Sequence, residues 1–183
     1  PQLQPLSEPG RPTLKILFHT NSPWASTGYG TQCAMLLPLL KEAGHDVAVS
    51  AFFGVQGAPL HWGEHLIYPA GGHPYGMDVL PPHALMHFEG EERGGLILTL
   101  IDVWVLDAQL LNRLPVACWT PIDHDPPPPS VIDFLRASGA VPIAMSRFGE
   151  ARLREAGLDP LYVPHGIDTE LYSPGDKGEA REK

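Results

Sequence analysis

Apolar residues along the chain fall into short runs that alternate with helical patterns. The runs that have the length of buried strands are 14–19, 47–53, 96–101, 116–119, 141–144 and 161–163. Apolar spacings of three and four residues between these runs predict helices near 29–43, 82–92, 106–112, 130–137 and 146–156. Alternating strands and helices with short connections are typical of a parallel sheet that is covered on both faces. The sequence therefore predicts an α/β fold with a doubly wound, Rossmann-like sheet.

The same pattern divides the chain into segments. Residues 1–13 are polar and rich in proline, so we expect a disordered leader, and residues 14–163 form one Rossmann-like domain. Residues 54–82 make a long excursion rich in Gly, Pro and His, with one brief strand at 66–68, and long loops of this kind are usually functional or disordered. Residues 164–183 leave the pattern and end in a charged stretch. We interpret them as an interdomain linker and the start of a missing domain, in a chain that has been cut.

Composition excludes several classes of partner. The net charge is −9 with only 12 Lys and Arg residues, which gives no cationic surface for nucleic acid. No stretch reaches the ~18 uncharged apolar residues of a membrane span, and no secretory signal is evident. The two cysteines, Cys33 and Cys118, show no metal-ligand spacing. We expect a soluble, cytoplasmic protein without a transmembrane segment.

Ligands of doubly wound sheets bind outside the carboxyl ends of the strands, so the loops that follow strands carry the candidate site. On this placement, the residues expected to line a ligand-binding cleft are Asp102, Trp104, Ser146, His165 and Gly166. The Trp104 ring offers an apolar face on which a sugar can pack, and the alternative is a tryptophan tucked into the core.

The stretch Asn21–Gln32 joins the first strand to the first helix and contains Gly28 and Gly30. Such a turn can aim free backbone N–H groups and a helix N-terminus at an anion. In the alternative, both glycines only permit a turn at positive φ. A dinucleotide fingerprint is excluded, because Cys33 stands where the third glycine is needed and no acidic residue closes the second strand.

Histidine pairs raise the question of a metal. His61 and His65 have the spacing of an inverted zinc-protease motif, but Pro59 and Gly63 disfavour the helix that it requires. His83 and His87 lie four apart on a predicted helix without the glutamate of a metalloprotease, and we expect them to be a surface pair. No metal is expected.

Asp123–His124–Asp125 follows a buried strand and lies among prolines that stiffen the loop. A histidine beside carboxylates can hold or orient a sugar hydroxyl, and a carboxylate can accept the proton of that hydroxyl. The alternative is an acidic loop that only caps the next helix, for which Ser130 with Asp133 forms a variant of a capping box.

Four segments together resemble one family. They are the strand 15–19 with its loop Thr27–Gly30, then Lys41–Val47, Ala144–Gly149 and, most specifically, Val163–Pro174. From about Leu14 onward the chain resembles the N-terminal domain of a GT-B fold retaining glycosyltransferase, family 4-like (group 1).

The resemblance implies two Rossmann-like domains that face each other across a cleft. The first would bind the acceptor and the second the nucleotide-sugar, without a metal ion or other cofactor. Gly28, Tyr29 and Gly30 would approach the donor phosphates, and His124 or Asp123 would act near the reacting sugar, although Thr120 could equally occupy the position of the histidine. No two glutamates stand eight apart here, as they do in the donor-binding domain of that family, so the chain is at most half an enzyme.

The expected function is thus the acceptor side of a glycosyltransferase that moves a sugar, with retention, onto a sugar or lipid acceptor. Its required partner is a C-terminal donor-binding domain. Two alternatives stay open: a non-catalytic module that binds phosphate or carbohydrate, and half of a sugar-nucleotide epimerase.

Overall fold

A computed structural model describes residues 12–170, 172, 174–175 and 178. Most of the expected leader, residues 1–11, and most of the charged stretch after Gly175 lie outside the described residues. The strands are β1 (Lys15–Asn21), β2 (Asp46–Phe53), β3 (Leu60–Trp62), β4 (His65–Tyr68), β5 (Leu96–Leu100), β6 (Val116–Thr120), β7 (Val141–Ala144) and β8 (Leu161–Tyr162). The helices are α1 (Gly28–Glu42), α2 (Leu80–His87), the 3-10 turn η1 (Val103–Val105), α3 (Ala108–Leu111), α4 (Pro129–Ser138) and α5 (Arg147–Glu155).

Strand β1 is the centre of the fold. The sheet has the order β3-β4-β2-β1-β5-β6-β7-β8, and β1 pairs in parallel with both β2 and β5. Leu17 and Phe18 are fully buried, as expected for a parallel strand that is covered on both faces. From β1 the chain moves outward to β2 and β4, then crosses back to β5 on the other side. The strand order therefore reverses between β1 and β5, where ligands of open α/β sheets bind.

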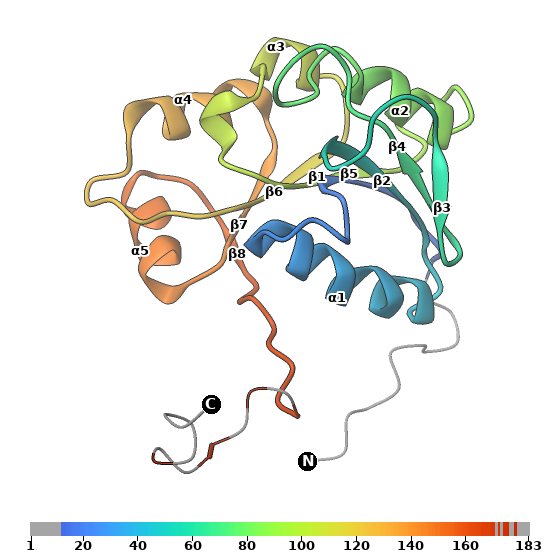
Figure 1. Cartoon of the computed structure of the whole chain (residues 1–183). Coiled ribbons are helices and arrows are strands. Elements are labelled where there is room, and N and C mark those ends of the chain that lie inside the picture. Colours follow the sequence, from blue (N-terminus) through green and yellow to red (C-terminus); the bar gives the residue numbers. More distant parts are fainter. Residues whose placement is uncertain (1–11, 171, 173, 176–177, 179–183) are drawn as a thin grey trace.

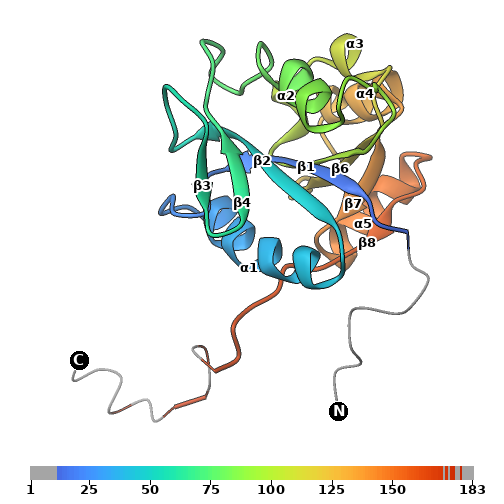
Figure 2. The same ribbon diagram turned by 90° about the vertical axis from the view of Figure 1, so that its right-hand side faces the viewer.

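Helices cover both faces of the twisted sheet. Figure 1 shows α2, α3 and α4 on one face and α1 on the other, while α5 lies at the far end beside β7 and β8. The perpendicular view gives the same two layers around the sheet (Figure 2). One apolar cluster joins Leu17 to α2 and α4 residues such as Leu80 and Phe134, and a second joins Phe18 to Leu37 of α1. The predicted doubly wound α/β fold is confirmed. No helix among the described residues is long and apolar enough to cross a membrane.

The structure differs from the sequence prediction in two elements. The excursion after β2 contains an antiparallel hairpin, β3–β4, of which only the second strand was predicted. Helix α4 begins after Pro128, and no side chain caps it, so the predicted cap by Ser130 and Asp133 is wrong. Because that cap is absent, the interpretation of the preceding acidic loop as a helix cap loses its basis.

The prediction of a surface histidine pair is wrong for His83. Its side chain is buried and stacks on Tyr68, and its Nδ1 atom lies 3.0 Å from the Ser50 hydroxyl oxygen. That hydroxyl is also 3.2 Å from Nδ1 of the fully buried His19, whose Nε2 lies 3.0 Å from the backbone oxygen of Tyr75. The apolar spacing around His83 gave no sign of this buried polar chain.

Hydrogen-bond chemistry determines which groups donate and which accept among these buried polar side chains. A carbonyl oxygen only accepts, so His19 donates from Nε2 to Tyr75, and its neutral ring then accepts at Nδ1. The Ser50 hydroxyl donates to that nitrogen and accepts from Nδ1 of His83. Burial lowers the pKa of His19 to about 4 and that of His83 to about 4, so both rings stay neutral at physiological pH. This His19–Ser50–His83 relay holds the segment around Tyr75 against β1 and β2.

Folding stability should therefore fall in mild acid. The folded pKa values lie below the ordinary value of 6.5, so the unfolded chain takes up protons first as the pH drops from about 6.5 toward 4. Between pH 7.5 and 5 the loss is about 2 kcal/mol for each histidine. Urea unfolding across this range measures it. In the His83→Gln variant the free energy of unfolding should depend less steeply on pH. The control variant His61→Ala, at an exposed site on β3, should keep the full pH dependence. A free energy of unfolding that stays flat from pH 7.5 to 5 would contradict the relay.

Candidate functional site

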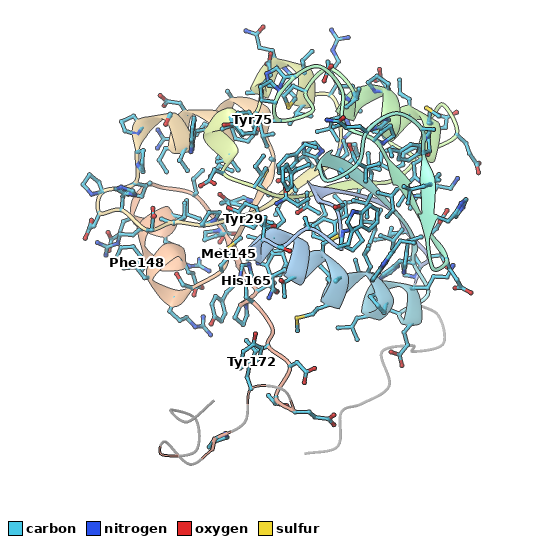
Figure 3. The ribbon with its side chains drawn as sticks, viewed as in Figure 1. Tyr29, Tyr75, Met145, Phe148, His165 and Tyr172 are labelled. Carbon is cyan, nitrogen blue, oxygen red and sulfur yellow. The ribbon has the colours of Figure 1, made fainter. Side chains whose placement is uncertain are left out.

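A hollow of about 340 Å³ opens where β1, β2 and β5 end. Its lining includes Asn21, Thr27, Tyr29, Phe53, Tyr75 and Asp102. Tyr29 lies in the first turn of α1, and Tyr75 comes from the segment on the other face of the sheet (Figure 3). We call it the strand-end hollow. It lies at the reversal of strand order, where the fold predicts a ligand.

Three larger hollows lie elsewhere in the described part of the chain. One of about 430 Å³ is formed by the end of α1 and the β3–β4 turn, at the amino edge of the sheet. Another of about 810 Å³ lies between the 73–78 segment and residues 105–110, and a third of about 560 Å³ lies against residues 109–113. None of the three contains a residue that the sequence placed at the site, whereas the strand-end hollow contains Tyr29 and Asp102.

Tyr29 and Asp102 join the two sides of the strand-end hollow. The Tyr29 hydroxyl donates to Oδ2 of Asp102 over 3.1 Å, which links the first turn of α1 to the loop after β5. Burial raises the pKa of Tyr29 well above its ordinary value, and the charges of Asp102 and Asp123 raise it further. The phenol therefore stays protonated and keeps donating. Strand β6 pairs in parallel with β5, so the loop after β6, which carries Asp123, leaves the same edge of the sheet as the loop of Asp102.

The first turn of α1 leaves backbone donors free. Thr27 is the N-cap, and its hydroxyl oxygen accepts from the Gly30 N–H over 3.0 Å and from the Asn21 amide over 2.7 Å. The N–H groups of Gly28 and Tyr29 have no acceptor among the described residues, as expected for the start of a helix. Two amides and the positive end of a 15-residue helix thus lie beside the hollow.

The two glycines have different roles. Neither has a positive φ, so the interpretation that both only permit a left-handed turn is wrong. A Cβ at Gly30 would clash with the carbonyl oxygen of Ala25, which fixes Gly30 as a packing residue. A Cβ at Gly28 would meet no atom within 4 Å. Gly28 is therefore the glycine that leaves space for a ligand against the backbone.

Asp123 and His124 lie at the exposed tip of the loop after β6. Nδ1 of His124 is 2.5 Å from Oδ1 of Asp123, and 67% of the His124 side chain is exposed. Asp125 points elsewhere, because it forms an ion pair with Arg152 of α5. Of the three residues in the motif, the first two are thus available to a ligand, while Asp125 anchors the loop.

Trp104 and Ser146 are placed differently. Trp104 in η1 is 58% exposed, so the alternative of a tryptophan tucked into the core is wrong. Ser146 is the N-cap of α5, and its hydroxyl accepts from the Gly149 N–H over 3.0 Å. This contact gives Ser146 a structural role, and its contact with an acceptor stays a prediction.

His165 and Gly166 lie on the segment that leaves the sheet, residues 163–168, which we call the exit segment. The His165 ring makes a T-shaped contact with Trp119 of β6, and partial burial lowers the pKa of His165. The Trp119 indole donates to the Val163 oxygen over 2.8 Å. The Gln32 amide of α1 donates to the Gly166 oxygen over 2.9 Å. The exit segment therefore passes the start of α1, and Figure 3 shows His165 and Tyr29 on the same side of the domain.

Comparisons with known proteins do not supply a family. No protein-family model matches the chain, and no curated protein matches it. Its function is therefore inferred from the residues and their geometry.

The described residues contain no group of three or more His, Cys, Asp or Glu side chains that could hold a metal ion. His61 and His65, which have a protease-like spacing in sequence, lie on the two strands of the β3–β4 hairpin rather than on a helix. The two histidines therefore match the inverted zinc-protease motif in their sequence spacing and not in their structure.

Sequence reasoning missed Phe53 and Tyr75, and did not single out Asn21 within its stretch. Asn21 and Phe53 are the last residues of β1 and β2, so the strand-end rule alone could have found them. Tyr75 could not be found in this way, because the relay from His19 places it and that contact joins residues 56 apart in the chain.

Alanine at the two glycines should separate packing from ligand access. Gly30→Ala should lower the free energy of unfolding by about 1–3 kcal/mol, because its Cβ meets a backbone oxygen that cannot easily move. Gly28→Ala should leave it unchanged or raise it by up to about 1 kcal/mol, because the site is open and φ is not positive. Urea unfolding of both variants tests this, and equal losses would show that the two glycines pack alike.

Proposed function

We propose that this chain is the acceptor-side domain of a GT-B fold, retaining glycosyltransferase. The enzyme would move a sugar from a nucleotide-sugar to a sugar or lipid acceptor without a metal ion. Its donor would be bound mainly by a second, C-terminal domain that closes over the carboxyl edge of the sheet.

The observation that carries the proposal is the convergence of three loops beside the strand-end hollow. The loop after β1 brings the free Gly28 and Tyr29 amides, the loop after β5 brings Asp102, and the loop after β6 brings Asp123 with His124. Amides suit a phosphate group, and carboxylates and imidazole suit sugar hydroxyls. A site that offers both on one edge supports transfer between a phosphorylated donor and a hydroxyl acceptor.

The proposed chemistry needs charge stabilisation more than a nucleophile. Departure of the nucleoside diphosphate leaves an oxocarbenium-like sugar, and donors fixed where negative charge develops lower that barrier. The Gly28 and Tyr29 amides are suited to the diphosphate, and His124 to a hydroxyl of the transferred sugar. Most of the remaining donors would come from the second domain.

The exit segment supports a partner on this edge. It is held by Trp119 and Gln32 as it passes the start of α1, so a domain attached after it would begin close to the Gly28–Tyr29 amides. It is also the beginning of Val163–Pro174, the most specific part of the resemblance.

Replacing His124 tests its role in the complete enzyme, meaning this chain joined to its donor-binding domain. We expect His124→Ala to lower kcat by about 100-fold or more with little change in KM, because the interaction is made mainly in the transition state. The readout is nucleoside diphosphate release coupled to glycosylated product by mass spectrometry. The matched control is His61→Ala, an exposed histidine on β3, which should retain full turnover.

Three results would contradict the proposal. Full turnover in His124→Ala would remove His124 from the chemistry. A complete protein that binds nucleotide-sugar and glycan but never forms product would favour the non-catalytic binding module. Epimerised donor without any acceptor would instead favour the epimerase.

A further inference from the structure

The strand-end hollow combines aromatic rings with a single carboxylate and no cationic side chain. Its lining contains no Lys, Arg or His, and Asp102 is its one charged residue. Exposed aromatic side chains border it, because Phe53 is 55% and Tyr75 37% exposed. Aromatic faces next to a carboxylate suit a ring that has apolar C–H surfaces and hydroxyl donors.

Asn21 adds a buried acceptor without a donor. The residue is only 6% exposed and lines the hollow, and its Nδ2 is engaged by Thr27. Its Oδ1 has no hydrogen-bond partner within the described part of the chain. A buried acceptor without a partner is costly and rare. Because this oxygen is itself buried, a small rotation of the Asn21 side chain toward the hollow would bring it to a ligand hydroxyl, and that hydrogen bond would relieve the cost.

Asp102 is positioned in a similar way. The Tyr29 hydroxyl occupies Oδ2 of Asp102, and no described contact occupies Oδ1. The carboxylate therefore has a fixed orientation and spare acceptor capacity. Both Asn21 and Asp102 accept hydrogen bonds here, and neither can pair with an anion.

We propose that the strand-end hollow binds an uncharged hydroxylated ring, a monosaccharide or cyclic polyol, and rejects the phosphorylated form of the same ring. One ring hydroxyl donates to Asn21 Oδ1 and another to Asp102, while Phe53 and Tyr75 pack on the ring faces. That this ring is the acceptor of a transfer reaction, and that the start of α1 serves the donor diphosphate instead, rest on the proposed function, whereas the binding of a neutral ring does not.

Rejection of phosphate follows from the charges that surround the hollow. An acceptor phosphate would lie near the Asp102 carboxylate with no cation in the lining to balance it. The anion-binding feature at the rim is the start of α1, which the proposed function gives to the donor diphosphate. We expect monophosphates to bind about tenfold more weakly than the neutral rings, or worse.

The test uses the 183-residue chain and no donor. Glucose, mannose, galactose and inositol are titrated against their monophosphates and followed by ¹H–¹⁵N NMR. At least one neutral ring should shift the Asn21 side-chain amide and the Phe53 and Asp102 backbone signals. Phe53→Ala, which removes an exposed ring, should weaken that binding about tenfold, and Trp62→Ala at the amino-edge hollow should not.

Asp102→Asn tests the charge, because the amide oxygen can still accept from Tyr29. In this variant the affinity for the neutral ring should stay within a few fold of that of the unaltered chain. The ratio between the affinities for the neutral ring and for its monophosphate should fall about tenfold. Tighter binding of a monophosphate to the unaltered chain, or no shift at the hollow with any neutral ring, would overturn the inference. Neutral binding with no transfer by the complete enzyme would overturn the proposed function alone, and transfer to a phosphorylated acceptor would overturn this inference alone.

Discussion

The hydrogen bond between Tyr29 and Asp102 is the constraint on which the site depends. It spans the reversal of strand order. There the chain after β1 enters α1 on one face of the sheet, and the chain after β5 continues toward the helices on the other face. Burial and nearby carboxylates raise the pKa of Tyr29, so its phenol stays protonated and can donate to Asp102 at physiological pH. It sets the distance between the free amides of α1 and the carboxylate, and so makes two loops into one site.

The other elements hold that edge rigid from both faces of the sheet. On one face the His19–Ser50–His83 relay fixes Tyr75 by a directed chain of hydrogen bonds through the core. On the other, Gly30 lets the first turn of α1 lie directly against the Ala25 carbonyl, which points the helix start at the hollow. The site is therefore preorganised by buried contacts rather than by its own exposed side chains.

Local pattern predicted most of the fold, and the strand-end rule predicted which loops meet at one edge of the sheet, because both depend on residues close in sequence. That rule placed Tyr29 and Asp102 correctly at one edge. It did not give the roles of Gly28 and Gly30, since these depend on whether a carbonyl from the preceding turn lies against the Cβ position. Nor did it give the buried state of His83 or the position of Tyr75, which follow from contacts across the sheet.

Under the proposed function, this chain supplies one half of a two-domain transfer site. The most direct measurement is nucleoside diphosphate release from a panel of nucleotide-sugars, with and without acceptor, by the 183-residue chain alone and by the same chain joined to a donor-binding domain. The account predicts no release by the folded chain alone, and release coupled to glycosylated product by the joined protein. Measurable turnover by the chain alone would contradict it.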